Sequence, residues 1–464
     1  MQYIEEPSRR VPIVADADVV VCGGGPGGFS AAIAAARHGA KTILIERYGF
    51  MGGLATAGLV APILGHTAAS RHGPCTDPIV EGLLREITER MHAKGGAPTW
   101  SETLQEWGIR FDAEALKIVL DEVCAEAGVQ LMLHTQVCDV SLHEGAIGAV
   151  LIESRSGRQA VRGAVFVDGT GDADVAYRAG APTTHGRPFD NRPESMGSFF
   201  HLAGYEPMSD ERRKEITGQL RDEMGKGVLK FYNPGFLAWN SHHHDHTSAN
   251  MSRFGGNSDD AADMTRGELS VRRDVWQLWE YVRKNVPEFR DCYVQQTSFQ
   301  VGPRESRQIV GPYVLTGEDV RQAAKFGDAV ARGSWWIDIH CPRGETYPVH
   351  LCMVECPKGA DCPFWASEHT RMLSRSELNP PDGDWYEIPY RSLLSVGVSN
   401  LLSSGRCISA THEGMAGSRV MGTCIAIGQA AGTAAALALS TGVPLGQLDA
   451  QVVQEALRQD GQLI

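Results

Sequence analysis

The sequence predicts an α/β protein in which helices cover a mostly parallel sheet. Three observations predict it. A strand, a glycine-rich turn, a helix and a second strand follow one another near the N-terminus, a run of short strands comes later, and a further strand leads into another glycine turn. Alternating strands and helices are typical of parallel sheets. A long middle segment of different composition then separates these elements from a final strand and helix, so both ends of the chain should build one domain.

The N-terminal unit has the element order of a dinucleotide-binding fingerprint. The apolar run Asp18 to Cys22 predicts a buried strand, and the alanine-rich stretch Phe29 to His38 predicts a helix. Thr42 to Ile45 predicts the next strand, which ends at the acidic residue Glu46. In this order the acid can accept hydrogen bonds from a ribose diol.

The glycines between the first strand and the helix each have a separate role in this interpretation. Gly23 allows the tight turn, Gly25 lets the backbone approach a pyrophosphate, and Gly28 lets the helix pack close to the strand. The N-terminus of the helix offers N–H groups and a positive dipole end to the phosphates. The alternative is a glycine-rich turn that binds nothing.

The composition of the chain limits the kinds of partner and the compartment that are expected. The chain has 464 residues, a formal net charge of −13 and 11 cysteines. The acidic balance argues against nucleic acid or an anionic membrane as main partner and leaves a small-molecule substrate and a homo-oligomer open. An odd number of scattered cysteines indicates reduced thiols and a cytoplasmic protein. Ser8-Arg9-Arg10 resembles an export signal, but Asp16 and Asp18 interrupt any apolar segment, and no transmembrane helix is expected.

Strands dominate the region after the first unit. Phe111 to Ala127 predicts a helix that Gly128 stops. A short strand and a β-meander follow, and the last meander strand runs into a second glycine turn. The expected strands are Val129 to His134, Gln136 to Leu142, Ala146 to Glu153 and Ala160 to Val167, and the turn is Asp168-Gly-Thr-Gly-Asp172.

The middle segment is richer in Trp, Pro, His and Cys, and Gly267 to Val286 within it predicts an amphipathic helix. We interpret it as an α+β substrate domain inserted into the cofactor domain. The strand Asn400 to Leu402 and the small-residue helix Cys424 to Leu439 return to the cofactor domain. The predicted boundaries are 1–184 and 386–464 for the two parts of the cofactor domain and 185–385 for the inserted domain.

Further motifs along nearly the whole chain resemble the FAD-dependent oxidoreductases of the glutathione-reductase-like flavoprotein superfamily. They are Met51-Gly-Gly-Leu-Ala-Thr56, Val167-Asp-Gly-Thr-Gly-Asp172, Gly302-Pro-Arg-Glu-Ser-Arg307, Tyr313-Val-Leu-Thr-Gly-Glu-Asp319, Ile337-Asp-Ile-His340, Ile388-Pro-Tyr-Arg391, Gly405-Arg-Cys-Ile-Ser-Ala-Thr-His412 and Arg419-Val-Met-Gly-Thr-Cys424.

The resemblance implies a Rossmann-like FAD-binding domain of the GR2 type, with FAD rather than NAD as cofactor. No second strand–GxGxxG–helix unit appears, so a dedicated NAD(P)H domain is not expected. The implied cofactor-binding residues are Gly23, Gly25, Pro26, Gly27, Gly28, Glu46, Arg47, Gly52, Gly53, Leu54, Ala55, Thr56, Val137, Gly169, Thr170, Gly171, Asp172, Gly405, Arg406, Gly422 and Thr423.

Three residues are candidates for the chemistry. His412 follows the strand that should end near the flavin, and His340 lies on a predicted strand, Ile337 to His340. Both imidazoles suit acid–base work, and both have a structural alternative. Arg304, which with Arg307 flanks Glu305, suits a substrate carboxylate or phosphate, or belongs to a buried ion-pair network at the domain interface.

Two clusters of potential ligands, one of cysteines and one of histidines, suggest a metal site without establishing it. Cys341, Cys352, Cys356 and Cys362 supply four thiols in one short stretch, but their spacing matches neither a zinc pair nor a ferredoxin motif. His242, His244 and His246 would share one face of a strand, or form a polar loop near the substrate cleft. We expect no metal site and keep the cysteine cluster as an alternative to free thiols or a local disulfide.

The leading hypothesis is an FAD-dependent oxidoreductase that acts on a small anionic organic substrate by hydride transfer through flavin N5. The alternatives are an electron-transfer subunit with a cysteine-bound metal or iron–sulfur centre, and a flavin monooxygenase. The substrate, the electron acceptor and the oligomeric state do not follow from the sequence.

Overall fold

The computed structural model describes residues 4, 8–70, 73–188, 190–230, 235, 242–243, 246–343 and 378–464. The N-terminal unit forms as the sequence predicts: β1 (Ile13–Cys22), α1 (Pro26–Arg37) and β2 (Thr42–Ile45) follow one another. β1 and β2 pair in parallel, and the backbone N–H of Gly23 donates to the carbonyl of Ile45 at 2.8 Å. The turn therefore leaves β1 at the carboxyl edge of the sheet, where α1 begins.

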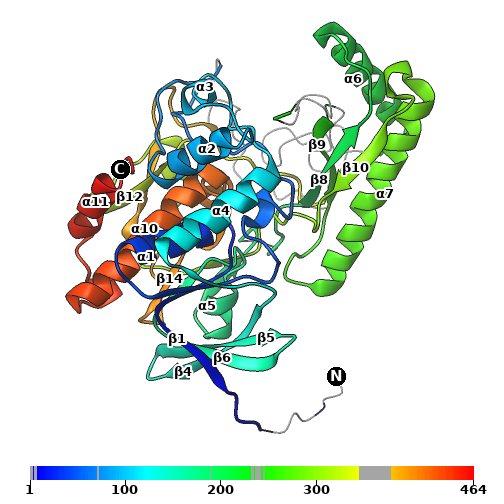
Figure 1. Ribbon diagram of the computed structural model, residues 1–464. Coiled ribbons are helices and arrows are strands. Elements are labelled where there is room, and N and C mark those ends of the chain that lie inside the picture. Colours follow the sequence, from blue (N-terminus) through cyan, green and yellow to red (C-terminus); the bar gives the residue numbers. More distant parts are fainter. Residues whose placement is uncertain are drawn as a thin grey trace.

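One mixed sheet joins both ends of the chain (Figure 1). Its strand order is β3-β2-β1-β6-β5-β4, and β14 also pairs with β6. The β1, β2, β3 and β14 pairings are parallel, whereas β4, β5 and β6 form the predicted antiparallel meander. The added strands are β3 (Gln130–Met132), β4 (Gln136–His143), β5 (Ala146–Ser154), β6 (Gly157–Asp168) and β14 (Leu401–Ser403).

Alternate residues of β1 serve two separate cores. Val19 and Val21 pack with the helices on one face of the sheet, and Val20 and Cys22 pack with the meander and α5 (Asp174–Arg178) on the other. All four side chains are fully buried. A continuous apolar run is the expected sequence for a strand covered on both faces.

The first core is layered by α1, α4 (Ala113–Ala127) and α10 (Met421–Thr441), which lie together over the sheet in Figure 1. α1 and α10 approach so closely that glycine is required in α10. A Cβ atom at Gly432 would lie 2.0 Å from the carbonyl oxygen of Ala31, and one at Gly428 would lie 2.2 Å from that of Gly27. Within the described ranges, α10 is also the one helix long and apolar enough to span a membrane, but 89% of its apolar window is buried inside the protein.

Smaller helices complete this part of the chain. Asp112 caps α4 by accepting from the N–H groups of Glu114 and Ala115, and Gly128 ends it in the left-handed conformation, as the sequence predicts. The other helices are α2 (Leu83–Ala93), α3 (Trp100–Thr103), α8 (Gly317–Arg321), α9 (His412–Ser418) and α11 (Ala450–Gln459), with short 3-10 turns at Gly53–Ala55, Pro287–Phe289, Tyr390–Ser392, Gly405–Cys407 and Leu445–Gln447.

A second sheet, β10-β8-β9, has its own buried core and projects with two helices to one side of the molecule (Figure 1). Its elements are β8 (Met196–Ala203), α6 (Asp210–Gly225), β9 (His246–Phe254), α7 (Ala261–Asn285) and β10 (Tyr293–Thr297). Two small sheets pair β7 (Thr183–His185) with β11 (Arg307–Ile309) and β12 (Ala329–Gly333) with β13 (Tyr386–Pro389). The boundaries 1–184, 185–385 and 386–464 stay a prediction.

One sequence prediction of local structure is wrong. No strand covers Ile337 to His340: the segment leaves β12 as mostly irregular chain, in which the N–H of Ile337 bonds to the carbonyl of Leu378 and the N–H of His340 to the carboxylate of Glu194. A further helix follows the 3-10 turn at Gly405–Cys407. Thr411 accepts a hydrogen bond from the N–H of Gly414 at 3.1 Å and so caps α9, which begins at His412.

The contact between α1 and α10 gives a test of the fold. Gly432→Ala places a methyl group against the backbone of α1 and should lower the free energy of unfolding by about 1–3 kcal/mol. The matched control is Gly218→Ala in α6, where a Cβ meets no atom within 4 Å. That change should be neutral or stabilise by about 0.5–1 kcal/mol. Urea unfolding measures the free energy of unfolding of both variants and of the parent. Equal free energies for the two variants would contradict the tight contact between α1 and α10.

Candidate functional site

A pocket opens at the carboxyl ends of β1, β6 and β14, where ligands of open α/β sheets usually bind. Its empty space is about 1890 Å³, including the part open to solvent. The lining is continuous from the glycine turn at Gly23 to Arg304 and His340, so one cavity borders all of them.

The glycine turn forms the floor of the pocket through backbone contacts. A Cβ atom at Gly23 would lie 2.5 Å from the carbonyl oxygen of Gly169, and one at Gly28 would lie 1.8 Å from that of Gly23. These two glycines are needed by the protein itself. Gly25 is different, because its Cβ would meet only the Cα of Gly53, at 3.9 Å, and it faces the pocket. The space above Gly25 is therefore left for a ligand.

Glu46 stands at the pocket wall, as predicted, and is fixed in place. Its carboxylate accepts from the N–H of Gly24 at 2.7 Å and from the N–H of Tyr48 at 2.9 Å. Burial raises the pKa of this carboxyl group, although both N–H groups oppose the effect. Each carboxylate oxygen has a second lone pair, so Glu46 can still accept a hydrogen bond from a ligand hydroxyl.

Arg47 and Tyr48 continue the wall beyond Glu46. Arg47 donates to the side-chain oxygen of Gln300 at 2.5 Å, and the hydroxyl of Tyr48 donates to the same oxygen. The guanidinium of Arg47 also lies 4.9 Å from the centre of the Tyr48 ring. Gln300 therefore ties the segment that leads to Arg304 to this part of the pocket.

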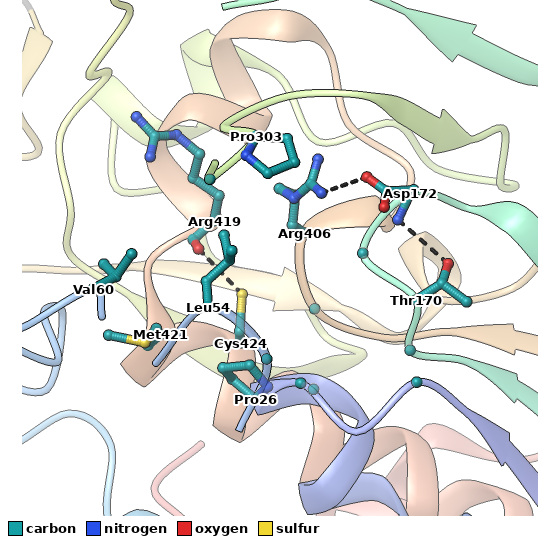
Figure 2. A pocket seen from close by; sticks show the side chains of 18 of the residues that line it. Pro26, Leu54, Val60, Thr170, Asp172, Pro303, Arg406, Arg419, Met421 and Cys424 are labelled. Carbon is teal, nitrogen blue, oxygen red and sulfur yellow. Dashed lines mark hydrogen bonds and ion pairs between the residues drawn. The ribbon is translucent and has the colours of Figure 1, made fainter. Parts of the chain in front are cut away.

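On the other side, Arg406 and Asp172 form a partly buried ion pair, drawn in Figure 2. Arg406 Nη2 lies 2.6 Å from Asp172 Oδ1, and Ser306 bonds to both partners. Burial acts to raise the pKa of Asp172, but Arg406 and Ser306 outweigh it and lower the pKa. Both residues line the pocket with their charges already paired, so they shape it more than they attract an ion.

Most residues predicted to hold the cofactor meet at this one pocket. Six of the predicted residues do not line it. Gly28 packs on the strand turn, and the hydroxyl of Thr56 bonds to the carbonyl of Met51 at 2.7 Å. The N–H of Gly422 bonds to Leu64, and the others are Gly52, Ala55 and Thr423. Those that line the pocket are Gly23, Gly25, Pro26, Gly27, Glu46, Arg47, Gly53, Leu54, Val137, Gly169, Thr170, Gly171, Asp172, Gly405 and Arg406.

Two of the three residues predicted for the chemistry line the same pocket. Arg304 donates from Nη1 to the carbonyl of Ser195 at 2.9 Å, and His340 lies beside Asp338, with 3.5 Å between Nε2 and Oδ2. Arg419 approaches the same Asp338 carboxylate at 3.5 Å and donates to its backbone carbonyl at 2.9 Å. Figure 2 shows Arg419 and Pro303 across the pocket from Pro26, with Leu54 between them.

Burial and the neighbouring charges set the protonation states of His340 and Asp338. Burial lowers the pKa of His340 to about 3; the Asp338 carboxylate opposes this, and the charges of Arg304 and Arg253 add to it. Burial acts to raise the pKa of Asp338, but His340 and Arg419 hold it well below its usual range. Around neutral pH the pocket therefore presents an ionised Asp338 next to a neutral imidazole.

His412 lies behind the pocket wall and does not line it. Its Nδ1 is 2.8 Å from Glu305 Oε1, and both side chains are almost completely buried. Burial acts to lower the pKa of His412, but the Glu305 carboxylate raises it to about 9. His412 is therefore an imidazolium paired with a carboxylate at neutral pH.

Glu194 connects this buried pair to the pocket. Its N–H donates to Glu305 at 2.8 Å, and its own carboxylate accepts from the N–H of His340 at 3.1 Å and from Arg419 at 3.3 Å. Sequence reasoning missed Glu194 because no local motif surrounds it. The positions of Asp338 and Arg419 lay inside motifs that the sequence already marked.

The segment Gly302 to Arg307 divides between the two interpretations that the sequence left open. Arg304 faces the pocket. Arg307 belongs to an ion-pair network, with 2.7 Å from its Nη2 to Asp174 and 3.6 Å to Asp259, and its guanidinium lies 4.4 Å from the centre of the Tyr177 ring. One residue of the segment, Arg304, thus lines the pocket, while another, Arg307, belongs to an ion-pair network.

The two suggested metal clusters gain no support within the described ranges, where no group of three or more His, Cys, Asp or Glu side chains could hold a metal ion. His242 lies in a turn before β9, which begins at His246, so no strand holds both. His244, Cys352, Cys356 and Cys362 lie outside the described residues, and Cys341 is buried.

The fold and the pocket together define a dinucleotide-binding α/β protein. The residues present fit FAD: the empty space above Gly25 lies at the N-terminus of α1, and the Ser404 hydroxyl, which lines the pocket, has no hydrogen-bond partner among the described residues. Residues 18–457 match the family model described as FAD dependent oxidoreductase. The chain belongs to this family, which makes it a flavoenzyme with FAD as its cofactor.

Individual relatives add little detail. Dihydrolipoyl dehydrogenases of Caenorhabditis elegans and Trypanosoma brucei brucei are 46% and 56% identical over 52 and 45 residues. These matches cover 11% and 10% of this chain and only 10% and 9% of the two relatives.

Two solved structures match most of the chain. A geranylgeranyl bacteriochlorophyll reductase-like protein of Thermoplasma acidophilum has 12% identity and a TM-score of 0.41, over 96% of this chain and 83% of its own. A triple mutant of the flavin-dependent brominase Bmp2 has 14% identity and a TM-score of 0.42, over 96% and 84%.

Gly25 gives a test of the cofactor site. Its backbone has φ −70° and ψ −177°, which alanine adopts without strain, and a Cβ would meet no close protein atom. Gly25→Ala should therefore leave the stability of the apoprotein unchanged and weaken FAD binding about tenfold or more, because the methyl group occupies ligand space. Flavin fluorescence titration measures the affinity, with Gly446→Ala as control. An unchanged affinity would show that FAD does not contact this turn.

The buried pair of His412 and Glu305 predicts a pH effect on stability. Because folding raises the pKa of His412 from 6.5 to about 9, the pair stabilises fully below pH 6.5 and loses its effect as the pH rises to about 9. The upper bound is about 3 kcal/mol. Melting curves from pH 6 to 10 should fall more steeply for the parent than for His412→Gln. Exposed His143→Gln should follow the parent; parallel curves for all three would contradict the assignment.

Proposed function

We propose that this FAD-dependent enzyme oxidises or reduces a small organic substrate by hydride transfer through flavin N5. The observation that carries the proposal is that His340, Asp338 and Arg304 line the same continuous pocket as the glycine turn. A cofactor held by the turn and a substrate held by Arg304 would then share one space. When bound, FAD would take up or release the hydride, with its two electrons, in such a reaction.

The cofactor would be held by the part of the pocket between β1, β2 and β6. The turn around Gly25 and the N-terminus of α1 suit the pyrophosphate, because helix N-termini present N–H groups and a positive dipole end. Glu46 suits the ribose hydroxyls, and Arg47 and Val137 border the same space. Apolar side chains at Val60, Leu64 and Met421 line it further along and would exclude water.

His340 is the proposed proton acceptor, with Asp338 as the residue that positions it. With the Nε2–H directed at Asp338, the lone pair of the imidazole lies on Nδ1. Oxidation of an alcohol or amine carbon releases one proton from the O–H or N–H, and Nδ1 would take up that proton. The resulting imidazolium would lie beside the ionised Asp338, which stabilises it. In a reduction the same atom returns the proton.

The segment 185–385 supports the idea of a substrate domain. Phe199, Asn250, Arg304, Asp338 and His340 all come from it and line the pocket. We therefore propose that this segment selects the substrate. The electron-transfer alternative depends on cysteines outside the described residues and keeps its own test, metal analysis of the purified protein. A cytoplasmic location is proposed from the odd number and the scatter of the cysteines along the sequence.

Anaerobic reduction tests this proposal. The FAD-bound protein is mixed with a panel of small hydroxy acids, amines and sugars, and flavin bleaching is followed. At least one class should bleach the flavin, and His340→Gln should slow the bleaching about 10²-fold or more, because a positioned base contributes ~10²–10⁴-fold. The matched control is His143→Gln, whose side chain is 84% exposed. Flavin that only dithionite reduces would sink the substrate-oxidoreductase proposal.

A further inference from the structure

Two arginines converge on a single glycine in the pocket wall. A Cβ atom at Gly197 would lie 2.8 Å from Nη1 of Arg253 and 2.8 Å from Nη1 of Arg304. Their Nη1 atoms therefore lie no more than twice that distance apart. Gly197 and Arg304 line the pocket, and so does Asn250, which accepts from Nη1 of Arg253 at 2.6 Å.

We propose that Gly197, Asn250, Arg253 and Arg304 form a subsite for one carboxylate group of the substrate. This inference rests on the proposed function and specifies its substrate class as a small organic monocarboxylate. The proposed subsite depends on the position of the two guanidinium groups, which both lie beside Gly197. Nη1 and Nη2 of Arg304 both lie beside Gly197, and such a fork of guanidinium donors suits the two oxygens of a carboxylate, with the charge of Arg253 next to it.

The subsite is built on rigid elements. Gly197 lies on β8, and its N–H and C=O groups bond to the C=O and N–H of Gly302 at 3.1 and 2.7 Å. This backbone bridge fixes the segment that carries Arg304, whose Nη1 is also held by Ser195 at 2.9 Å. Arg253 lies on β9, the neighbouring strand, is 5% exposed and donates to the carbonyl of Ser252 at 2.8 Å. Little order has to be gained on binding, which favours affinity.

The surrounding charges favour a single negative charge. Asp338 lines the pocket in its ionised form, and both arginines act on the neighbouring His340. A carboxylate bound beside the guanidinium groups carries one negative charge, whereas a phosphate dianion would be repelled more strongly by Asp338. The same carboxylate would weaken the field by which both arginines disfavour the imidazolium form of His340, so binding would make this residue a better proton acceptor.

The rest of the wall suits an apolar body attached to the carboxylate. Phe199, two residues after Gly197 on β8, also lines the pocket. Trp335 and Val420 line the pocket as well. These side chains offer no charge, so the carboxylate is the group that fixes the orientation of the substrate.

Binding of benzoate to the oxidised holoenzyme tests the subsite without turnover. Calorimetry and the flavin absorbance spectrum should both show saturable binding of benzoate, weaker binding of phenyl phosphate and little binding of benzyl alcohol. Arg304→Gln should weaken benzoate binding about 10- to 100-fold, since it removes charged hydrogen bonds. Gly197→Ala should weaken it too, because its methyl group displaces both guanidinium groups. The matched control Arg273→Gln changes an exposed arginine on α7 and should bind benzoate like the parent.

The possible failures are distinguishable. Equal binding of benzoate by Arg304→Gln and the parent, or equal binding of benzyl alcohol and benzoate, overturns the subsite while flavin reduction by the panel still supports the proposed function. Tighter binding of phenyl phosphate than benzoate overturns the monocarboxylate assignment. If no panel member reduces the flavin but calorimetry shows Arg304-dependent benzoate binding, the proposed function fails and the subsite stands.

Discussion

Close approach of backbone to backbone is the constraint on which this structure depends. Where β1 turns into α1, the chain passes so near to Gly169 and to α10 that no side chain fits at Gly23, Gly28, Gly428 or Gly432. The contacts join a segment from the N-terminus to one from the C-terminus of the chain. Because β6 and β14 pair beside β1, the same packing brings their carboxyl ends together and so creates the floor of the pocket. The chemistry of the site follows from this packing, since the glycines that admit the helices also leave the space above Gly25.

The buried charged side chains near the pocket are paired with one another. His412 and Glu305 neutralise each other, and Glu194 shares its carboxylate between Arg419 and the backbone of His340. Burying ionised groups is costly unless each one has a partner and hydrogen bonds. Burial raises the pKa of Glu194, and the Arg419 guanidinium opposes this effect. The contacts of Glu194 fix the backbone of His340 and the guanidinium of Arg419. The neutral state of His340 is therefore a property of the surroundings and not of the imidazole alone.

The sequence predicted the parts that depend on local pattern. The turn from Gly23 to Gly28, the acid Glu46, the meander and the helix around Gly428 have periodicity or spacing that physical rules can interpret. The missing parts depend on contacts between distant segments. Over Ile337 to His340, where the sequence predicts a strand, the N–H of Ile337 bonds to Leu378 and the N–H of His340 to Glu194, two residues far away in sequence. Similarly, nothing near His412 shows that its partner is Glu305, and nothing near Gly197 shows that two arginines meet there.

The short segment from Gln300 to Arg304 spans both parts of the pocket. Gln300 is held by Arg47 and Tyr48 next to Glu46, and Gly302 is bonded to β8 beside the two arginines. Both anchor points are fixed in space, so the number of residues between them is fixed as well. The length of this stretch sets the distance between the proposed nucleotide site and the proposed site of the substrate carboxylate. A longer or shorter stretch would alter the register between the two ligands even if every side chain named here were kept.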